Sequence, residues 1–430
     1  MVDESLPDPA TKPVQGLSSP GEFGTLDTES AGPDLRIRDR GSRWLPLALP
    51  IAIFAVVAAL YAGLAWLRTP REIDLHIYRE AMAFMANGHF LYDYVYQYVL
   101  DGQLQTLGFT YPPFAALLLL PLGGLPEVPT QMAWLAATFI EVLLLAVALV
   151  WGLHKEGRRP RPALRDPETW TVVLWFAVAL LVSVPTLGHV LVGQVSLALV
   201  LLVYVDMTLV PRSWRGPLTG IAAAIKLTPL VFIGYLLLTR QWRATAQAAI
   251  TFVACSALGW LVLPRESAAY WGFWLWQPSR VGNPAMEDNK SLLGLVSRAA
   301  GTGGPATAVW LVAVVVVAVV GLRHAIKLSR AGLHSSGALV AGCVALAVSP
   351  ISWPHHQFWV LLYALTALVG GSRWWRFWGV VILVVFNSCL LFVTFAPDGL
   401  LTPLTDVPVL VIAACCLLGL PALRPDRGDP

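Results

Sequence analysis

Apolar segments of bilayer-spanning length alternate with short polar segments along almost the whole chain. Runs of about 20 apolar residues, the length that a transmembrane helix needs, recur from residue 44 to residue 423. The first run covers residues 44–66. This pattern predicts an all-α, polytopic integral membrane protein with about 11–13 membrane segments and interfacial helices between some of them.

Two segments depart from the simple pattern of full crossings. Residues 113–126 are short for a span, and we expect a re-entrant or strongly tilted segment there. Residues 220–238 are apolar but carry Lys226 and Pro229 in the middle. Because proline cannot continue the helical hydrogen-bond pattern, a break is expected at this point.

Charged residues predict the orientation of the chain. Residues 1–34 are polar and rich in Pro and Gly, which predicts a disordered tail, and four arginines follow it at 36, 38, 40 and 43. By the positive-inside rule this end is cytoplasmic, so the 67–110 loop is periplasmic. Residues 424–430 form a second expected cytoplasmic tail. Four further segments without basic clusters should share the face of the 67–110 loop: 188–194, 264–290, 349–356 and 396–403.

Composition supports the membrane assignment. The chain has 57% hydrophobic and 13% charged residues and a mean hydropathy of +0.65, whereas globular proteins carry about 25% charged residues. The net charge of +3 is small and the basic residues lie between spans, which argues against nucleic-acid binding. The five cysteines lie in apolar runs without metal-ligand spacing, so we interpret them as buried small hydrophobes.

Asp74 is the first candidate for chemistry. It lies just beyond the first apolar run and is followed at helical spacing by Tyr78, Met82 and Met85, which predicts an interfacial helix ending near Asn87-Gly88. A carboxylate held there could accept a proton from a sugar hydroxyl or orient a sugar, although a loop carboxylate can also simply be solvated.

His355 and His356 are the second candidates, at the expected end of a span. Adjacent histidines are a weak metal pair because neighbouring helical residues point in different directions, and no third ligand lies nearby in the sequence. One of them could act as a general base near neutral pH, or both could be interfacial hydrogen-bonding groups. Asp74 and this pair are therefore alternative bases.

Three cations are candidates for binding a phosphate: Lys226, Arg280 and Lys290. A lysine among apolar residues is costly in a membrane unless it reaches the surface or pairs with an anion. Polar and aromatic residues at the expected periplasmic ends could bind sugar or acceptor: Tyr78, Tyr111, His189, Gln194, Asn289 and Trp353. For His189 and Gln194, capping of a helix is an equal alternative. No phosphate-binding glycine loop or serine-hydrolase motif is present.

Several sequence blocks, in this order, resemble those of a known family. They are Asp74-Leu75 with Tyr78, Gly88, Leu91-Tyr92, Phe109-Thr110-Tyr111-Pro112-Pro113-Phe114-Ala115, Gly193-Gln194, Ala224-Ile225-Lys226-Leu227-Thr228-Pro229, and Ser349-Pro350-Ile351-Ser352-Trp353 with His355-His356. The combination is similar to that of the actinobacterial polyprenol-phosphate-mannose-dependent mannosyltransferases. These are membrane enzymes of the GT-C type in glycosyltransferase family 87.

The resemblance implies one transmembrane catalytic domain over residues 35–423 in the plasma membrane. It implies inverting transfer of mannose from polyprenyl phosphate to a lipid-anchored mannoside at the periplasmic face, through an α-(1→2) bond. The acceptor would be a phosphatidylinositol mannoside, lipomannan or lipoarabinomannan. Asp74 corresponds to the loop aspartate of the family, and His355 and His356 to its histidine block.

Two further expectations and two alternatives complete the interpretation. A lipid-phosphate donor needs no paired metal-binding carboxylates, so we expect no cofactor and no metal, and nucleic acid is not an expected partner. An arabinofuranosyl or glucosyl transferase that uses another polyprenyl-phosphate sugar is the alternative within the class. A flippase for a lipid-linked sugar is the alternative from another class, which the interruptions at Pro113 and Pro229 would suit.

Overall fold

The computed structural model describes residues 45–67, 73–100, 103–277, 282–369, 371–395 and 405–421. The expected tails at 1–34 and 424–430, the 396–403 segment and Arg280 lie outside the described residues. The helices are α1 (Leu45–Leu67), α2 (Ile73–Ala86), α3 (Pro113–Leu119), α4 (Glu127–Lys155), α5 (Pro167–Leu181), α6 (Val184–Val192), α7 (Ser196–Thr208), α8 (Pro217–Ile225), α9 (Leu230–Leu238), α10 (Trp242–Val262), α11 (Pro264–Gly272), α12 (Leu292–Ala300), α13 (Gly304–Arg330), α14 (His334–Val348), α15 (Phe358–Val369), α16 (Arg373–Phe395) and α17 (Val407–Leu418). Short 3-10 helices are η1 (Leu91–Asp93), η2 (Leu120–Gly124), η3 (Trp274–Trp276) and η5 (Pro354–His356).

The helical membrane fold is confirmed. In the part of the chain that the structure describes, α1, α4, α10 and α13 are long and apolar enough to cross a bilayer, and α5 with α6 makes a fifth candidate bent by 63°. Five further apolar helices have 10–17 residues. This measure gives fewer crossings than the 11–13 segments expected, because several apolar runs are divided into short helices.

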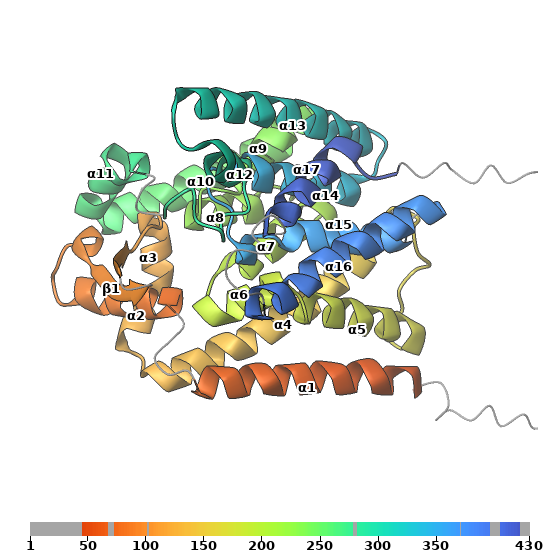
Figure 1. Cartoon of the computed structure of the whole chain (residues 1–430), viewed down its shortest axis with the longest axis horizontal. Coiled ribbons are helices and arrows are strands. Elements are labelled where there is room, and N and C mark those ends of the chain that lie inside the picture. The colour runs from red at the N-terminus through yellow and green to blue at the C-terminus, as the bar shows by residue number, and fades with distance from the viewer. Residues whose placement is uncertain are drawn as a thin grey trace, which may run out of the picture. The chain divides into compact units, whose positions relative to one another are not determined.

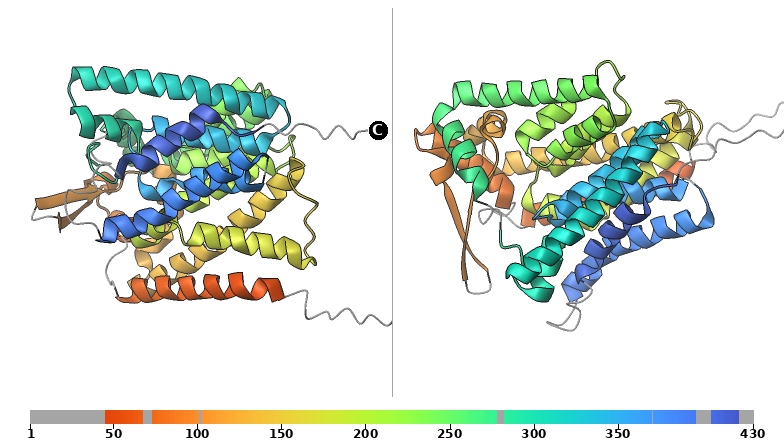
Figure 2. Two further views of the ribbon diagram at one scale, coloured as in Figure 1. Left: turned by 45° about the vertical axis from the view of Figure 1, so that its right-hand side comes forward. Right: turned by 90° about the horizontal axis from the view of Figure 1, so that it is seen from above.

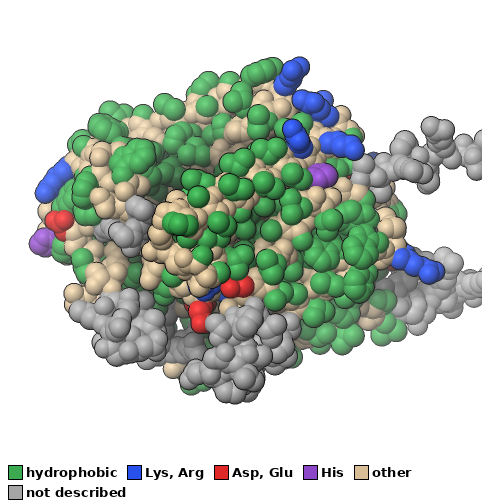
Figure 3. Space-filling view, turned by 45° about the horizontal axis from the view of Figure 1, so that its top comes forward, with side chains coloured by type: hydrophobic (Ala, Val, Ile, Leu, Met, Phe, Trp, Pro, Cys, Tyr) green, Lys and Arg blue, Asp and Glu red, His purple; other side chains and the backbone are tan. Residues whose placement is uncertain are grey.

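Burial separates the helices into an inner and an outer set (Figure 1). Helices α14 and α15 are buried along most of their length, and they pack with α4, α5 and α7 in the main hydrophobic core. Helices α1 and α13 lie at opposite edges in Figure 1 and expose many large apolar side chains. In Figure 3, apolar side chains cover most of the described surface in view, while Lys and Arg gather mainly toward its right-hand side. Such a surface suits contact with lipid.

Helix α2 is the helix that the sequence predicted after the first apolar run. Leu75, Tyr78 and Met82 lie on its buried face, and the chain leaves it through Gly88 at a φ of +85°, which glycine adopts without strain. Gly123 of η2 allows the close approach that holds this helix, because a Cβ at this position would lie 2.7 Å from the backbone nitrogen of Ala83. The packing of α2 thereby fixes the position of Asp74 near its N-terminus.

A two-stranded antiparallel sheet follows α2 and was not predicted. Strands β1 (Val95–Leu100) and β2 (Gln103–Gly108) pair in a register that runs from Val95 opposite Gly108 to Leu100 opposite Gln103. Figure 2 shows this hairpin extending from the end of the molecule that carries α2. The ring of Tyr96 lies 5.1 Å from that of His76, which connects the hairpin to α2.

Three interruptions between helices position the polar side chains of the interior. Gly193, at a φ of +70°, ends α6 before α7 begins. Lys226 is extended, with φ −146° and ψ 133°, and Pro229 follows it, so α8 and α9 are separate helices as the sequence predicted. Residues 349–353 and η5 separate α14 from α15. The three interruptions lie near one another, since Lys226 contacts His356 and both line one pocket with Ser196.

Candidate functional site

Asp74 lies at the start of α2 and is half-buried. The Nε2 atom of Gln194 donates a hydrogen bond to one of its carboxylate oxygens. Burial raises the pKa of Asp74 above its ordinary value, and the hydrogen bond from Gln194 and the charge of Lys226 oppose this shift. Among the described residues Gln194 is the one that donates to this carboxylate, so the second oxygen has no protein partner there.

Gln194 is the last member of a chain of hydrogen bonds between side chains. The hydroxyl of Tyr78 donates to that of Tyr111 at 2.8 Å, and the Tyr111 hydroxyl donates to Oε1 of Gln194 at 2.9 Å. The sequence had predicted these three residues as sugar or acceptor contacts. The structure brings them together with Asp74, but their polar groups bind one another.

Trp134 and Tyr92, which were not predicted as site residues, bind the backbone of two members of this hydrogen-bonded chain. Trp134 Nε1 donates to the backbone carbonyl oxygen of Gln194 at 3.2 Å, and the hydroxyl of Tyr92 donates to the backbone carbonyl oxygen of Tyr111 at 2.9 Å. An aromatic residue in an apolar segment gives no signal in one sequence that its polar atom has a distant partner. These two bonds hold the backbone at Gln194 and at Tyr111.

Lys226 connects the hydrogen-bonded chain to the histidine block. Its Nζ atom lies 3.3 Å from the hydroxyl of Tyr111 and 3.0 Å from Nε2 of His356. The same atom lies 5.1 Å from the centre of the Tyr111 ring. Four residues predicted from the sequence, Asp74, Tyr111, Lys226 and His356, are therefore parts of one cluster.

The hydrogen bond from the backbone of Trp353 favours one tautomer of His356. The backbone N–H of Trp353 donates to Nδ1 at 3.2 Å, which favours a ring hydrogen on Nε2, and Nε2 is the atom that faces Lys226. Burial lowers the pKa of His356 well below its ordinary value, with the charge of Lys226 acting in the same direction, so the ring is neutral near pH 7. A ring N–H and an ammonium group thus point at each other without an acceptor between them.

His355 and His189 lie behind this cluster. The rings of His355 and His356 are 4.5 Å apart and perpendicular. Nε2 of His355 and both ring nitrogens of His189 are buried and have no hydrogen-bond partner among the described residues. Burial lowers the pKa of His355 well below its ordinary value, and Lys226 and His189 add to this effect.

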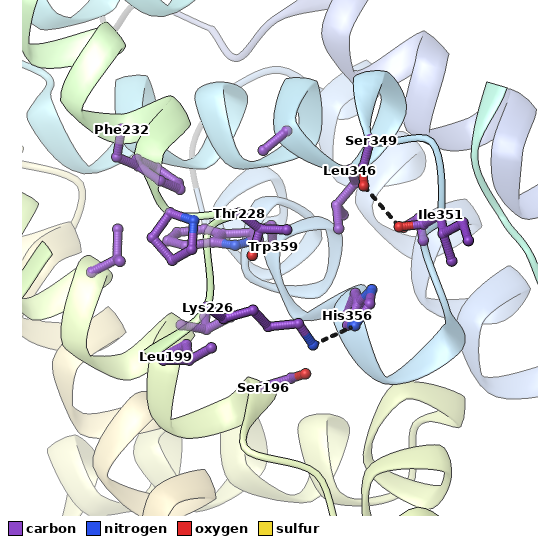
Figure 4. Close-up of a pocket in the computed structure, with 15 residues that line it drawn as sticks. Ser196, Leu199, Lys226, Thr228, Phe232, Leu346, Ser349, Ile351, His356 and Trp359 are labelled. Carbon is purple, nitrogen blue, oxygen red and sulfur yellow. Dashed lines mark hydrogen bonds between the residues drawn. The ribbon is translucent and has the colours of Figure 1, made fainter. Parts of the chain in front are cut away.

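A pocket opens beside Lys226 and His356 (Figure 4). Its apolar wall comes from α7, α9, α14, α15 and the loop before η5: Leu199, Val200, Val203, Phe232, Leu346, Ile351 and Trp359. The Lys226 amine and the His356 ring face this pocket, and the hydroxyl of Ser196 lies near them. The pocket therefore combines an apolar chamber with hydrogen-bond donors on one side.

The remaining predicted residues have other partners. Nζ of Lys290 donates to the carbonyl oxygens of Glu287 and Thr405, at 2.6 and 2.8 Å. Asn289 is fully buried, donates to the carbonyls of Pro284 and Pro350, and accepts the backbone N–H groups of Ser291 and Ser352. These bonds join the 284–291 loop to the 349–353 loop.

Trp353 contributes its backbone to the site through His356. Its ring lies against the backbone of Gly282, where an added Cβ would come within 2.7 Å of a ring carbon.

In the described ranges no group of three or more His, Cys, Asp or Glu side chains could hold a metal ion.

Comparison with known proteins gives the family of the chain. The model of glycosyltransferase family 87 matches residues 109–350, a range that contains Tyr111, Gln194 and Lys226 but neither Asp74 nor His356. No solved structure matches the chain.

Two curated relatives cover most of the chain. One is a polyprenol-phosphate-mannose-dependent alpha-(1-2)-phosphatidylinositol mannoside mannosyltransferase of Mycobacterium tuberculosis, 28% identical over 85% of this chain and 86% of the relative. Another is a polyprenol-phosphate-mannose-dependent alpha-(1-2)-phosphatidylinositol pentamannoside mannosyltransferase of Mycolicibacterium smegmatis, 31% identical over 81% of each chain. The chain belongs to glycosyltransferase family 87.

Proposed function

We propose that the protein transfers mannose from polyprenyl-phosphate mannose to a hydroxyl of a phosphatidylinositol mannoside, with inversion, through an α-(1→2) bond. The names of the relatives support the donor, the acceptor class and the bond. The observation that carries the proposal is that Lys226 and His356 line one apolar pocket, while hydrogen bonds through Tyr111 and Gln194 connect Lys226 to the carboxylate of Asp74. Lipomannan and lipoarabinomannan are further acceptors of the same chemistry.

Asp74 is the proposed general base. One oxygen accepts from Gln194 and leaves the other for the acceptor hydroxyl. His356 is a poorer base, because Nδ1 already accepts from Trp353 and Nε2 carries the hydrogen. A carboxylate whose pKa is raised by burial is also a stronger proton acceptor than an ordinary aspartate.

The reaction then balances in one step. The acceptor oxygen bonds to C1 of mannose while the bond from C1 to the phosphate oxygen breaks, and the hydroxyl proton passes to Asp74. The leaving phosphate gains negative charge as this bond breaks. Hydrogen-bond donors directed at that charge stabilise the transition state more than the ground state.

Lys226 and His356 are the proposed phosphate site, and the pocket is the proposed site of the first isoprenoid units. A phosphate oxygen near both Nζ and the Nε2–H would accept a hydrogen bond from each of them. Leu199, Phe232 and Trp359 offer apolar contacts to the chain beyond the phosphate. Of the other predicted phosphate ligands, Lys290 already binds two backbone carbonyls.

We further propose that this site faces the periplasm and that the N-terminus is cytoplasmic, as the four arginines before the first span indicate. No metal or other cofactor is part of the proposed reaction, because the donor carries its own phosphate leaving group.

A flippase for the lipid-linked sugar is the alternative, and one experiment separates the two functions. The purified full-length chain would be placed in vesicles with polyprenyl-phosphate mannose and a mycobacterial glycolipid extract, and mass spectrometry would follow the lipids. A glycolipid that gains one hexose supports the transferase. Movement of the donor between leaflets without any mannosylated product would support the flippase.

A further inference from the structure

Tyr78, Tyr111, Gln194 and Asp74 form a chain of hydrogen bonds in which each donor and acceptor is fixed. Gln194 Oε1 has no hydrogen to give, so Tyr111 must donate to it, and the Tyr111 oxygen then accepts from Tyr78 and Lys226. Burial raises the pKa of Tyr78 well above its ordinary value, so its hydroxyl keeps the hydrogen that it donates. Each group in the chain therefore has one role, either donor or acceptor, at each contact.

This direction determines the orientation of the Gln194 amide. With Oε1 held by Tyr111 at 2.9 Å, the NH₂ group must face Asp74. A second donor to Oε1, the hydroxyl of Ser196, lies at 3.5 Å and is a weak contact at most. Without the Tyr111 hydroxyl, Oε1 would lose its short hydrogen bond, and the Gln194 side chain could turn away from the carboxylate.

We infer that Gln194 is a positioning residue that holds one oxygen of Asp74, and that Tyr111 orients Gln194 by fixing its amide oxygen. The inference rests on the proposed function, in which Asp74 is the base, and it assigns Gln194 and Tyr111 a role other than contact with sugar. Because Tyr111 also accepts from Lys226, the same hydroxyl joins the proposed phosphate site to the base.

Loss of the Gln194 hydrogen bond also has a consequence for pH dependence. A donor to a carboxylate favours its charged form, so removing the donor raises the pKa of Asp74 further. Lys226 and Tyr78 are the ionisable groups that interact with Asp74, the first lowering its pKa. Among the segments that contact α2, His189 of α6, Tyr92 and the exposed Asp93 of η1, and Glu127, which forms ion pairs with His76 and Arg79, are further titratable groups. On α2 itself the other titratable or charged side chains are those of His76, Arg79 and Glu80.

The test compares the full-length wild type with Tyr111→Phe, Gln194→Leu and the double variant, in the mannosyl-transfer assay. We expect each single variant to lower kcat by roughly 10²-fold, because the base is displaced. The KM for the acceptor should change by less than about threefold, since no contact with the acceptor is lost. The acidic limb of kcat against pH should move to higher pH in each variant.

The double variant gives an independent readout. If Tyr111 acts through Gln194, adding Tyr111→Phe to Gln194→Leu should cost less than about threefold in kcat. Tyr204→Phe is the matched control, because it removes another buried hydroxyl, bonded to Ser335 at 2.6 Å, without touching this chain. It should leave kcat and the pH profile unchanged. Thermal unfolding of each variant checks its folding, and Tyr111→Phe, which keeps the ring, carries the test if Gln194→Leu does not fold.

The outcomes separate the inference from the proposed function. Absence of transfer by the wild type would overturn the proposed function. Transfer by the wild type, with variants that raise the acceptor KM but keep kcat and the pH limb, would identify sugar contacts and overturn the inference. Multiplicative losses in the double variant would also overturn it, because they would mean that the two residues act independently.

Discussion

Nζ of Lys226 and Nε2 of His356 lie 3.0 Å apart, and the backbone N–H of Trp353, which donates to Nδ1 of His356, favours a ring hydrogen on the Nε2 that faces Lys226. The two residues come from the interruption between α8 and α9 and from η5, which are 130 positions apart in the sequence. Two donors without an acceptor are an unfavourable pair until an anion lies between them. The relationship accounts for a lysine within an apolar segment, where it would otherwise be costly.

Replacing Lys226 tests this anion site. We expect Lys226→Met to lower kcat/KM for polyprenyl-phosphate mannose by ~10²–10³-fold, the loss typical for one donor to a developing negative charge. Lys155→Met is the matched control. Lys155 lies at the end of α4 and donates to the carbonyls of Thr208 and Leu209, away from the proposed site. Steady-state rates at varied donor concentration measure both. Equal losses in the two variants would show that any lysine matters and would remove the assignment.

The pH dependence of kcat tests the environment of Asp74. A carboxylate must be ionised to act as a base, so kcat falls as the pH falls through the pKa of Asp74. Burial raises this pKa, so the acidic limb of the pH profile should lie above the ordinary aspartate value of about 3.9. Lys226 lowers this pKa, so Lys226→Met should move the limb to still higher pH. Rates between pH 4 and 8 give the limb. A shift to lower pH in the variant would contradict the interaction.

Asn289 is expected to stabilise the fold and not to bind sugar. Asn289→Ala leaves the buried N–H of Ser352 and the carbonyl of Pro350 with one partner fewer, which should cost about 2–3 kcal/mol of unfolding free energy. Thermal unfolding in detergent measures the loss. The KM for the acceptor should stay within about twofold of the wild type at a temperature where the variant is folded. A large rise in this KM with unchanged stability would restore the sugar contact expected from the sequence.

Activity should not depend on a divalent metal ion. The proposed leaving group is stabilised by Lys226 and His356, so treatment with a chelator should leave the transfer rate unchanged. The measurement is the initial rate before and after chelation. Loss of activity that a divalent ion restores would show that the phosphate is bound through a metal instead.

Local features of the site could be predicted from the sequence because each has a local cause. Pro229 predicted the break between α8 and α9. The helical spacing of Tyr78 and Met82 after Asp74 predicted α2. The hairpin was missed although alternating residues flank Asp101-Gly102, a pair typical of two-residue turns. The apolar composition around it favoured helices throughout.

The connections within the site could not be predicted. Whether Tyr111 contacts a sugar or Gln194 depends on the relative position of α3 and the α6–α7 turn, 83 residues apart, and nothing in the sequence of either segment fixes it. The same holds for Lys290, whose ammonium group binds the carbonyl of Thr405 in a distant segment. Pairing of polar groups across helices is a property of the packing, which a single sequence does not display.

The most direct test of the proposed reaction compares wild type with Asp74→Asn, which keeps the shape of the side chain and removes the base. Both purified proteins would be given polyprenyl-phosphate mannose and a phosphatidylinositol mannoside, and mass spectrometry with linkage analysis would identify the product. We expect the wild type to add one α-(1→2)-linked mannose and the folded variant to lose at least ~10²-fold in rate. Wild-type-like transfer by Asp74→Asn would contradict the assignment of Asp74 as the base.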